Sequence, residues 1–452
     1  MKPNSAAVRS GYACLAVVLA CAAVFSCTED GAESAESGTA AVPYEAVPAQ
    51  ANVPGFDGGR RDTGMNANRL APVRIGPSEM ANGWAFVSAG QRHTAAIGKD
   101  GSLWAWGMLA LDDGLVKIRN RPVRIGSQMD WVYASSGGFH TLLLKADGSL
   151  WAWGGNNWGV LGDGMGEGGW YSNRLEGMQY VPVQIGAGRS WASVSAGSNH
   201  SAAVAADGSL WTWGCNSYGQ LGDGGDGNDG LWPMFNNTME RVGTDSDWAS
   251  VCAGGNFTVA IKTDGSLWVW GTNYWGQLGN GAGGEGEGHG NRYGKNKPVR
   301  IGSENDWAVA VTGGNHTVAL QTDGSLWAWG YNAYGQLGNG EGGGGYEKRY
   351  EGGHNIPERV GTGNDWTAVS AGWSNTVALR ADGSLWAWGL ISNNGEVVRQ
   401  TTPVRIGTSQ WTAASSGYSH TAIIGTDGSL WTWGGNRWGQ LGDGTDGGGR
   451  PY

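Results

Sequence analysis

The sequence is poor in several residue types, and each shortage argues against a class of protein. Of its 452 residues only 5 are Cys, and three of these lie within the first 27 positions. The other two, Cys215 and Cys252, occupy different positions in neighbouring repeats, so we expect separate buried thiols rather than a disulfide scaffold. Basic residues number 29 against 39 acidic ones, and the net charge of −10 argues against nucleic acid as a partner.

Familiar catalytic motifs are also missing. The sequence has no Gly-rich phosphate loop, no nucleophile elbow and no pair of carboxylates that stands out as acid and base. The run at 223–230 resembles a calcium loop only loosely, because the bidentate Glu and flanking helices of an EF-hand are absent. We therefore expect a protein that is not an enzyme and has no cofactor or metal, with calcium at this run as the open alternative to a solvated loop.

The N-terminus carries an apolar run. Residues 11–25 are almost wholly apolar but too short for a comfortable membrane span, which is typical of a signal-peptide core. The run ends in Val24-Phe25-Ser26-Cys27, which resembles the lipobox of bacterial lipoproteins. We predict that residues 1–27 are a signal peptide and that Cys27 is lipidated, with Cys21 as the competing site. An ordinary cleaved signal peptide is the alternative.

The next segment is typical of a tether. Residues 28–71 are rich in Ala, Gly, Ser, Glu and Pro and have few large apolar residues. Together with the lipidated cysteine, this segment predicts a protein of the cell envelope, periplasmic or at the cell surface. Its only attachment to the membrane would be the lipid anchor, since a net negative charge gives no attraction to an anionic surface.

In contrast, Gly and Trp are abundant, with 84 and 27 residues. High Gly with high Trp favours tight turns between short aromatic strands, because disordered chains are poor in aromatics. The rest of the chain, 72–452, is one unit written seven times. Asp-Gly-Ser-Leu-Trp-x-Trp-Gly recurs together with a Pro-Val-x-Ile-Gly segment and a lone Trp before Val-Ser-Ala-Gly. The first Trp of each pair is Trp104, Trp151, Trp211, Trp268, Trp327, Trp386 or Trp431.

Each unit predicts four short strands, two of them joined by the Asp-Gly turn. In Leu-Trp-x-Trp the two Trp point to one face of the strand, where their rings can fill the wedge between neighbouring units. Seven four-stranded units predict an all-β, seven-bladed β-propeller. Because no strand follows the last unit, we expect the segment at 72–76 to complete the C-terminal blade and to close the ring.

The string Gly-x-x-His-Thr-Ala-Ala-x-x-x-Asp-Gly-Ser-Leu-Trp-x-Trp-Gly-x-Asn-x-x-Gly-Gln-Leu-Gly resembles the repeat of the regulator-of-chromosome-condensation family. The resemblance covers residues 72–452, although Gly-Gln-Leu-Gly is missing at 108–111 and 390–393, where we expect trimmed loops. It implies a seven-bladed propeller that works through one face. Family members include a nuclear exchange factor for a small GTPase and a secreted β-lactamase inhibitor, so exchange-factor-like and inhibitor-like activities are alternatives. Secretion fits the first of these poorly.

A histidine recurs at one position of the unit, and Phe257 and Asn375 replace it in two repeats. Metal ligands converge in threes or fours, whereas a propeller spreads equivalent positions around a ring. We therefore predict a structural role, with each ring bonding the backbone of the next turn. The residues are His93, His140, His200, His316 and His420.

Four insertions precede the Pro-Val-x-Ile-Gly segments, at 165–181, 225–239, 282–297 and 341–356. Insertions at equivalent points must emerge on one face, and aromatic and Arg residues among Gly and Asn are typical of a protein-binding surface. We therefore predict a monomer that binds a protein partner. A carbohydrate-binding propeller and loops with stray aromatics are the alternatives. The predicted binding residues are Trp170, Tyr171, Arg174, Trp232, Phe235, Arg292, Tyr293, Tyr346, Arg349 and Tyr350.

Overall fold

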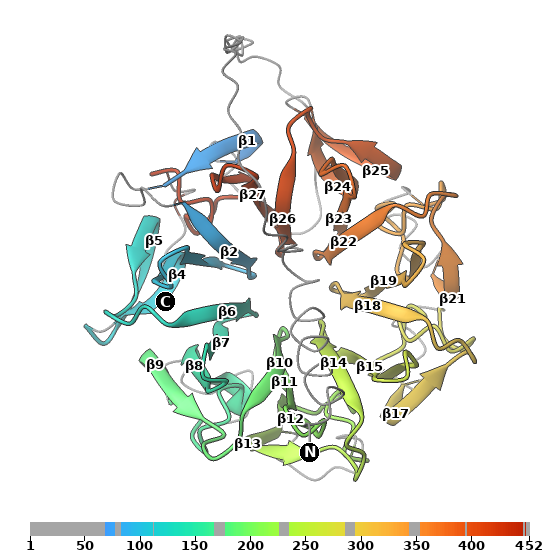
Figure 1. Cartoon of the computed structure of the whole chain (residues 1–452), viewed down its shortest axis with the longest axis horizontal. Helices are drawn as coiled ribbons and strands as arrows, with labels where there is room; N and C mark the ends of the chain where they lie inside the picture. The colour runs from blue at the N-terminus through green and yellow to red at the C-terminus, as the bar shows by residue number, and fades with distance from the viewer. Residues whose placement is uncertain are drawn as a thin grey trace, which may run out of the picture.

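The strands form seven four-stranded antiparallel sheets, arranged as blades around a central axis (Figure 1). This confirms the predicted seven-bladed β-propeller. Within the described ranges the one helical segment is a 3-10 turn, η2 (Asn157–Gly159), and none of their helices is both long and apolar enough to cross a bilayer. The computed structural model describes residues 68–76, 83–111, 113–166, 177–225, 235–284, 294–342, 353–393, 396–445 and 448.

Each blade contains four strands, which follow sequence order from the axis outward in blades 1 to 6, whereas in blade 7 the N-terminal strand is the outermost (Figure 1). The strand nearest the axis begins with the lone Trp, and the outermost strand contains or corresponds to the Pro-Val-x-Ile-Gly segment. Blade 1 is β2 (Trp84–Ala89), β3 (His93–Gly98), β4 (Leu103–Leu111) and β5 (Leu115–Arg124). Blades 2 to 4 are β6 (Trp131–Ser136), β7 (His140–Lys145), β8 (Leu150–Gly154), β9 (Gln179–Ile185); β10 (Trp191–Ala196), β11 (His200–Ala205), β12 (Leu210–Cys215), β13 (Phe235–Arg241); and β14 (Trp248–Ala253), β15 (Phe257–Lys262), β16 (Leu267–Gly271), β17 (Lys295–Ile301). Blades 5 to 7 are β18 (Trp307–Thr312), β19 (His316–Gln321), β20 (Leu326–Gly330), β21 (His354–Arg359); β22 (Trp366–Ala371), β23 (Asn375–Arg380), β24 (Leu385–Asn393), β25 (Glu396–Arg405); and β26 (Trp411–Ser416), β27 (His420–Gly425), β28 (Leu430–Gly434), β1 (Arg69–Ile75).

The ring is closed by its first strand. β1 pairs antiparallel with β28, with Val73 opposite Thr432 and Ile75 opposite Leu430. Arg69 Nε also lies 2.5 Å from Asp443 Oδ2, across the same seam. Closure by the N-terminal strand is therefore confirmed, and this strand begins at Arg69 rather than at residue 72.

The Asp-Gly turns that join the second and third strands follow from local chemistry. Asp207 Oδ1 accepts hydrogen bonds from the Ser209 backbone N–H and hydroxyl, at 3.0 and 2.5 Å. The hydroxyl bond is the main reason that the pKa of Asp207 is lowered. Gly208 takes φ +78°, and a Cβ there would lie 2.1 Å from the Ser246 carbonyl oxygen, so only Gly fits.

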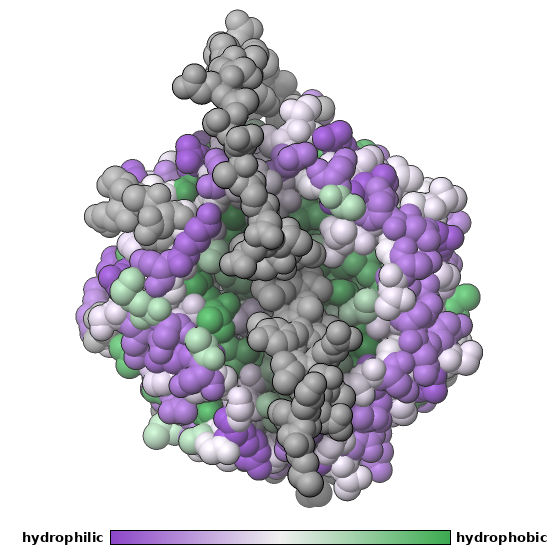
Figure 2. All heavy atoms as spheres, viewed as in Figure 1, coloured by the Kyte–Doolittle hydropathy of each residue, from purple (hydrophilic) through white to green (hydrophobic). Residues whose placement is uncertain are grey.

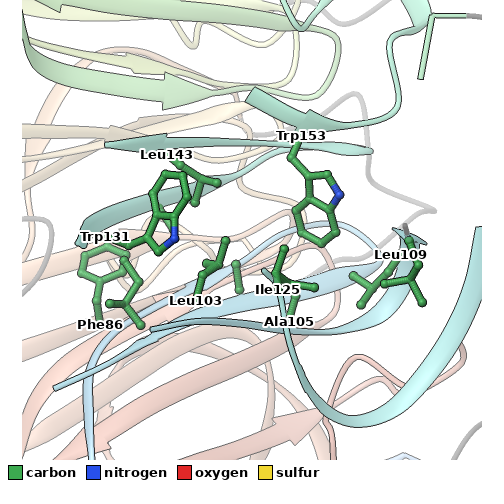
Figure 3. Packing of buried hydrophobic residues seen from close by; sticks show 12 residues of the cluster. Phe86, Leu103, Ala105, Leu109, Ile125, Trp131, Leu143 and Trp153 are labelled. Atoms are coloured by element: carbon green, nitrogen blue, oxygen red, sulfur yellow. The ribbon is translucent and has the colours of Figure 1, made fainter. Parts of the chain in front are cut away.

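The core lies in the wedges between blades. Leu103 and Ile125 of blade 1 pack against Trp131, Leu143 and Trp153 of blade 2 (Figure 3). On the face in view in Figure 2, hydrophobic residues gather around the axis and hydrophilic ones at the rim. The second Trp of the Trp-x-Trp pair is buried in every blade, and it has no exposed surface in five of them, as Trp106, Trp213, Trp270, Trp329 and Trp388.

Two blades extend their outer hairpin where the Gly-Gln-Leu-Gly turn is missing. Pairing continues from β4 to β5 as far as Leu111 opposite Leu115, and from β24 to β25 as far as Asn393 opposite Glu396. The expectation of trimmed loops was therefore incomplete. Without the turn, the third and fourth strands of these blades keep pairing beyond the point where the turn stands in the other blades.

Both cysteines in the described part of the chain are free thiols, as expected. Cys215 is buried, and burial is the main reason that the pKa of its thiol is raised. Cys252 is half-buried rather than buried as expected, with Sγ 3.1 Å from Thr312 Oγ1 of the next blade.

Candidate binding face

One face of the ring collects the variable segments. Because strands in a blade are antiparallel, the connection from first to second strand and that from third to fourth lie at the same end. The described ends of all four insertions belong to third-to-fourth connections, so they lie on one face, as predicted. We call it the insertion face. The Asp-Gly turns lie on the opposite face.

The centre of the insertion face is a ring of turns bonded to one another through their backbones. Gln91 N donates to Gly137 O, and Tyr418 N donates to Gly90 O, so the ring passes through the closure seam. A Cβ at Gly137 would lie 2.4 Å from the Gly197 carbonyl oxygen, which explains the Gly at this turn. The residue after that Gly is small or polar in five blades and aromatic in two. It is Gln91, Gly138, Ser198, Gly255, Gly314, Trp373 or Tyr418.

The repeated histidines tie each blade to the next. In every case Nε2 bonds a hydroxyl in the second strand of the following blade, and the ring is buried. The structural interpretation agrees with this geometry, although the partner is a side chain rather than the backbone. The pairs are His93 with Thr141 (2.8 Å), His140 with Ser201 (2.9 Å), His200 with Thr258 (2.9 Å), His316 with Thr376 (3.1 Å) and His420 with Thr94 (2.7 Å).

The hydrogen-bond chain at His200 fixes the tautomer of the imidazole. Thr258 Oγ1 has a single proton, and it donates this proton to the Gln220 carbonyl oxygen at 2.8 Å. His200 must therefore donate from Nε2–H to Thr258. Burial lowers the pKa of His200 to about 3, so the ring is neutral at pH 7. The Gln220 oxygen also accepts from Trp270 Nε1, at 2.9 Å.

Aromatic side chains also lie on the insertion face. They come from the turn Asn-x-x-Gly-Gln-Leu-Gly or its variant. Asn216 shapes such a turn, because its Oδ1 accepts from Leu221 N and its Nδ2 donates to Asp223 Oδ1, both at 3.0 Å. The residue before the Gly is aromatic in all five blades that have the turn: Trp158, Tyr218, Trp275, Tyr334 and Trp438.

Arginine side chains lie over aromatic rings on this face. The Arg92 guanidinium lies 4.6 Å from the ring centroid of Phe139 and 4.8 Å from that of Trp438. Arg437 lies 5.2 Å from the same Trp438 ring. Such cation–π contacts hold aromatic and Arg side chains in place at an exposed surface. The sequence analysis missed these residues because it considered only the insertions; the signal was the aromatic residue that recurs before each Gly.

Only one predicted binding residue belongs to the described part of the chain. Phe235 begins β13, is half-buried, and its ring centroid lies 6.3 Å from that of Trp158. The other nine lie outside the described residues: Trp170, Tyr171, Arg174, Trp232, Arg292, Tyr293, Tyr346, Arg349 and Tyr350. Cys21, Cys27 and residues 28–67 of the predicted tether also lie outside them.

The described end of the acidic run folds onto its own turn. Asp223 Oδ1 accepts from the Gly225 backbone N–H at 2.8 Å as well as from Asn216. Residues 226–230 lie outside the described residues. Among the residues that are described, no three His, Cys, Asp or Glu side chains lie together in a way that could hold a metal ion.

The opposite face also carries aromatic rings beside cations, and in blade 4 the cation is salt-bridged. Lys262 Nζ lies 4.9 Å from the ring centroids of both Trp248 and Trp268. Its Nζ is also 2.7 Å from Asp245 and 3.0 Å from Asp247. The Lys therefore covers the edge of its own blade rather than presenting a free aromatic surface.

The seven repeated blades, the closure by β1 and the backbone hydrogen bonds between axial turns define a seven-bladed propeller with one variable face. The chain belongs to the RCC1-like domain family: residues 55–351 match the model of the RCC1-like domain. Residues 366–396 and 411–440 match the model of the regulator of chromosome condensation (RCC1) repeat. The resemblance seen in the sequence is therefore confirmed.

Individual relatives match parts of their own length. The chain is 32% identical over 213 residues to the ultraviolet-B receptor UVR8 of Arabidopsis thaliana, covering 46% of the chain and 43% of the receptor. It is 27% identical over 354 residues to the regulator of chromosome condensation of Homo sapiens, covering 74% of the chain and 65% of that protein. The chain thus spans less than two thirds of each relative.

Two solved structures share the fold. Prp20p from Saccharomyces cerevisiae superposes with a TM-score of 0.62 at 19% identity, covering 82% of this chain and 87% of that one. Human WBSCR16 superposes with a TM-score of 0.62 at 18% identity, covering 80% and 88%.

Proposed function

We propose that the chain is a non-enzymatic lipoprotein of the cell envelope whose insertion face binds a protein partner. One observation carries the proposal. Ordered aromatic and Arg side chains, among them Arg92, Phe139 and Trp438, lie on the same face from which all four insertions emerge. Aromatic residues and Arg are the residue types that contribute most to binding energy in protein interfaces.

The rigidity of the ring supports this proposal. β1 closes the last blade, and backbone, histidine and indole hydrogen bonds join successive blades. A preorganised surface loses little conformational entropy when a partner binds. Loops that emerge from a rigid frame, next to ordered rings such as Trp438, are the arrangement that antibodies use to build a paratope.

Related propellers support a protein partner. The structure of Prp20p is described together with its binding properties to Gsp1p and histones. Yeast RCC1 (Prp20) has been solved bound to Kap60, and it superposes on this chain with a TM-score of 0.60 at 19% identity. Which protein this chain binds is set by its own insertions, since these differ from one blade to the next.

A binding role also fits the titratable groups of the described residues. The groups whose pKa is lowered most are the repeated histidines, and each is buried in a hydrogen bond between blades. The carboxylates of the Asp-Gly turns are engaged by the Ser two residues later. Both sets have a structural task, which supports a non-enzymatic propeller.

The envelope location rests on the sequence of the first 27 residues and is tested separately. Cells expressing the chain would be fed a radiolabelled fatty acid, and the protein would be immunoprecipitated. We expect label in the wild type and in Cys21→Ser, and none in Cys27→Ser. Label that persists in Cys27→Ser would contradict the assigned anchor site.

The partner is tested by capture from an envelope extract with the whole chain. One variant has its insertions at 165–181, 225–239, 282–297 and 341–356 shortened, and another carries Arg92→Ala, which uncovers Phe139 and Trp438. Arg300→Ala is the matched control, because Arg300 is exposed on the opposite face, where it bonds Ser303 O. We expect a protein that the wild type and the control retain and both variants lose. Equal retention by all four would place the site elsewhere.

A further inference from the structure

Three departures from the repeat meet at the seam between blades 6 and 7. Blade 6 lacks the Gly-Gln-Leu-Gly turn, with Leu390–Asn393 continuing β24 instead. Asn375 stands where five other blades have His. Trp373 and Tyr418 stand at axial turn positions where the other blades have small or polar residues, and their ring centroids are 4.7 Å apart at 36°. No other seam combines all three.

At the other seams a backbone carbonyl of the preceding blade accepts hydrogen bonds from side chains of the next blade, and the departures remove this acceptor. In blade 4, Gln220 O of the preceding blade accepts from Thr258 Oγ1 and Trp270 Nε1. Their counterparts in blade 7 are Thr421 and Trp433. No hydrogen bond among the described residues reaches Thr421 Oγ1 or Trp433 Nε1.

The replacement of His by Asn has the same effect on Thr421. The Asn375 side chain is shorter than His, and its Nδ2 donates to Ser416 Oγ at 2.8 Å instead of reaching Thr421. Blade 1 also lacks the turn. There the Ala110 carbonyl oxygen replaces the carbonyl oxygen of the turn and accepts from Trp153 Nε1 of the next blade at 3.0 Å. Loss of the turn alone therefore does not expose these groups.

The result is a cavity of about 710 Å³ on the insertion face, between blades 6 and 7. This volume lies within the range of small-molecule sites. Trp373, Tyr418, Tyr331 and Tyr334 provide aromatic walls, and Thr421 and Trp433 lie among the lining groups. Asn315, Ser374, Asn375, Ser392 and Ser419 add amides and hydroxyls.

The residues that line the cavity favour an uncharged ligand. None of the described residues that line the cavity is Asp, Glu, Lys, Arg or His. A charged ligand would lose its hydration without an opposite charge in the lining. Hydroxyls and amides can both donate and accept, so they suit a ligand with many hydroxyl groups. Flat aromatic walls suit the apolar C–H faces of a sugar ring.

We propose that this cavity is a binding site for a neutral saccharide, with a sugar ring against Trp373 and hydroxyls bonded to Thr421 and Asn375. Tyr418 is protonated at neutral pH, since burial raises the pKa of its phenol, so it can donate as well as accept. The site occurs once per ring, because the three departures occur together once. It is independent of the protein partner, whose contacts involve the wider insertion face.

The test is direct titration of the whole chain with glucose, galactose, mannose, N-acetylglucosamine and their common disaccharides. Saturation-transfer NMR identifies a bound sugar, and calorimetry gives its dissociation constant, which we expect on the order of 0.1–10 mM. Loss of a stacking ring in Trp373→Ala should weaken binding by about tenfold or more. If no sugar of the panel binds, the proposal is wrong.

A second variant separates loss of the site from loss of the fold. Asn375→His restores the latch seen between His316 and Thr376, so it should bind Thr421, narrow the cavity and raise Tm. Binding should fall while the fold becomes more stable. Tyr274→Ala is the matched control, since Tyr274 lies on the insertion face but not in the cavity lining, and it should leave the dissociation constant unchanged. If Tyr274→Ala weakens binding as much as Trp373→Ala, or if Trp373→Ala and Asn375→His leave it unchanged, the sugar binds elsewhere and the proposal is wrong. The capture experiment decides the protein partner separately, whichever way this test turns out.

Discussion

The hydrogen bonds between blades can be measured with a pair of nearly isosteric substitutions. Thr258→Val removes the hydroxyl that accepts from His200 Nε2–H and donates to Gln220 O. Gln220 O keeps its bond from Trp270 Nε1, so it stays satisfied. His200 loses its acceptor in a site with no exposed surface. We expect about 1 kcal/mol for the lost hydroxyl bond and a further 1–3 kcal/mol or so for the buried donor left unpaired.

Thr317→Val is the matched control that the chain itself provides. Thr317 Oγ1 donates to Gln277 O at 2.8 Å, as Thr258 does to Gln220, but Phe257 stands in the histidine position before it. This variant removes one bond and leaves no imidazole unpaired, so it should cost about 1 kcal/mol. The difference between the two variants isolates the contribution of the histidine.

Both costs would be read from guanidinium unfolding followed by Trp fluorescence, with the m value checked for constancy between variants. Thr258→Val should lower the free energy of unfolding by roughly twice as much as Thr317→Val, or more. Equal losses would refute the inference that His200 donates to Thr258, and with it the assigned tautomer.

Other predictions follow from the same contacts. The pKa of His200 is about 3 in the folded chain against about 6.5 when unfolded, so the unfolded chain binds the extra proton between these values; Tm should fall as pH drops below about 6.5. His200→Phe, which copies Phe257, should flatten this dependence by about one proton in calorimetric scans across pH, and an unchanged slope would contradict the buried neutral ring. Ile75→Ala in β1 should cost about 2–5 kcal/mol at the closure seam, whereas Val181→Ala at an exposed position of β9 should cost under 1 kcal/mol; similar costs in guanidinium unfolding would argue against closure by β1. Cys215 should react with iodoacetamide at pH 7 only after unfolding, because burial raises the pKa of its thiol, and fast labelling of the native chain in mass spectra would count against that environment.

The repeat predicted most of the fold because the period of the chain is the period of the structure. Asp-Gly-Ser-Leu-Trp placed the hairpin of every blade, and the segment at 72–76 predicted the strand that closes the ring. Contacts between blades were harder to foresee, since they depend on how one blade is rotated against the next. For this reason the histidines were expected to bond the backbone, whereas they bond hydroxyls such as Thr258.

The candidate site was predicted less well, for a related reason. The sequence shows that residues 390–393 lack the usual turn and that Asn375 replaces a histidine. It does not show that Asn375, Thr421 and Trp433 line one cavity, because they come from adjacent blades and from different strands. Only the folded ring shows that the missing turn and Asn375 lie at the same seam between two blades.

Closure by β1 also has a consequence for biosynthesis. β1 ends at residue 75, and its partner β28 begins at residue 430, so the first strand of the ring is translated long before its neighbour exists. At about 5–20 residues per second the interval is on the order of tens of seconds. During this time β1 is an unpaired edge that could join the wrong chain. Pro72, which has no N–H to offer, and the exposed Arg74 are residues that discourage such pairing. The strand that completes the ring thus also carries residues that protect it from wrong pairing until β28 has been made.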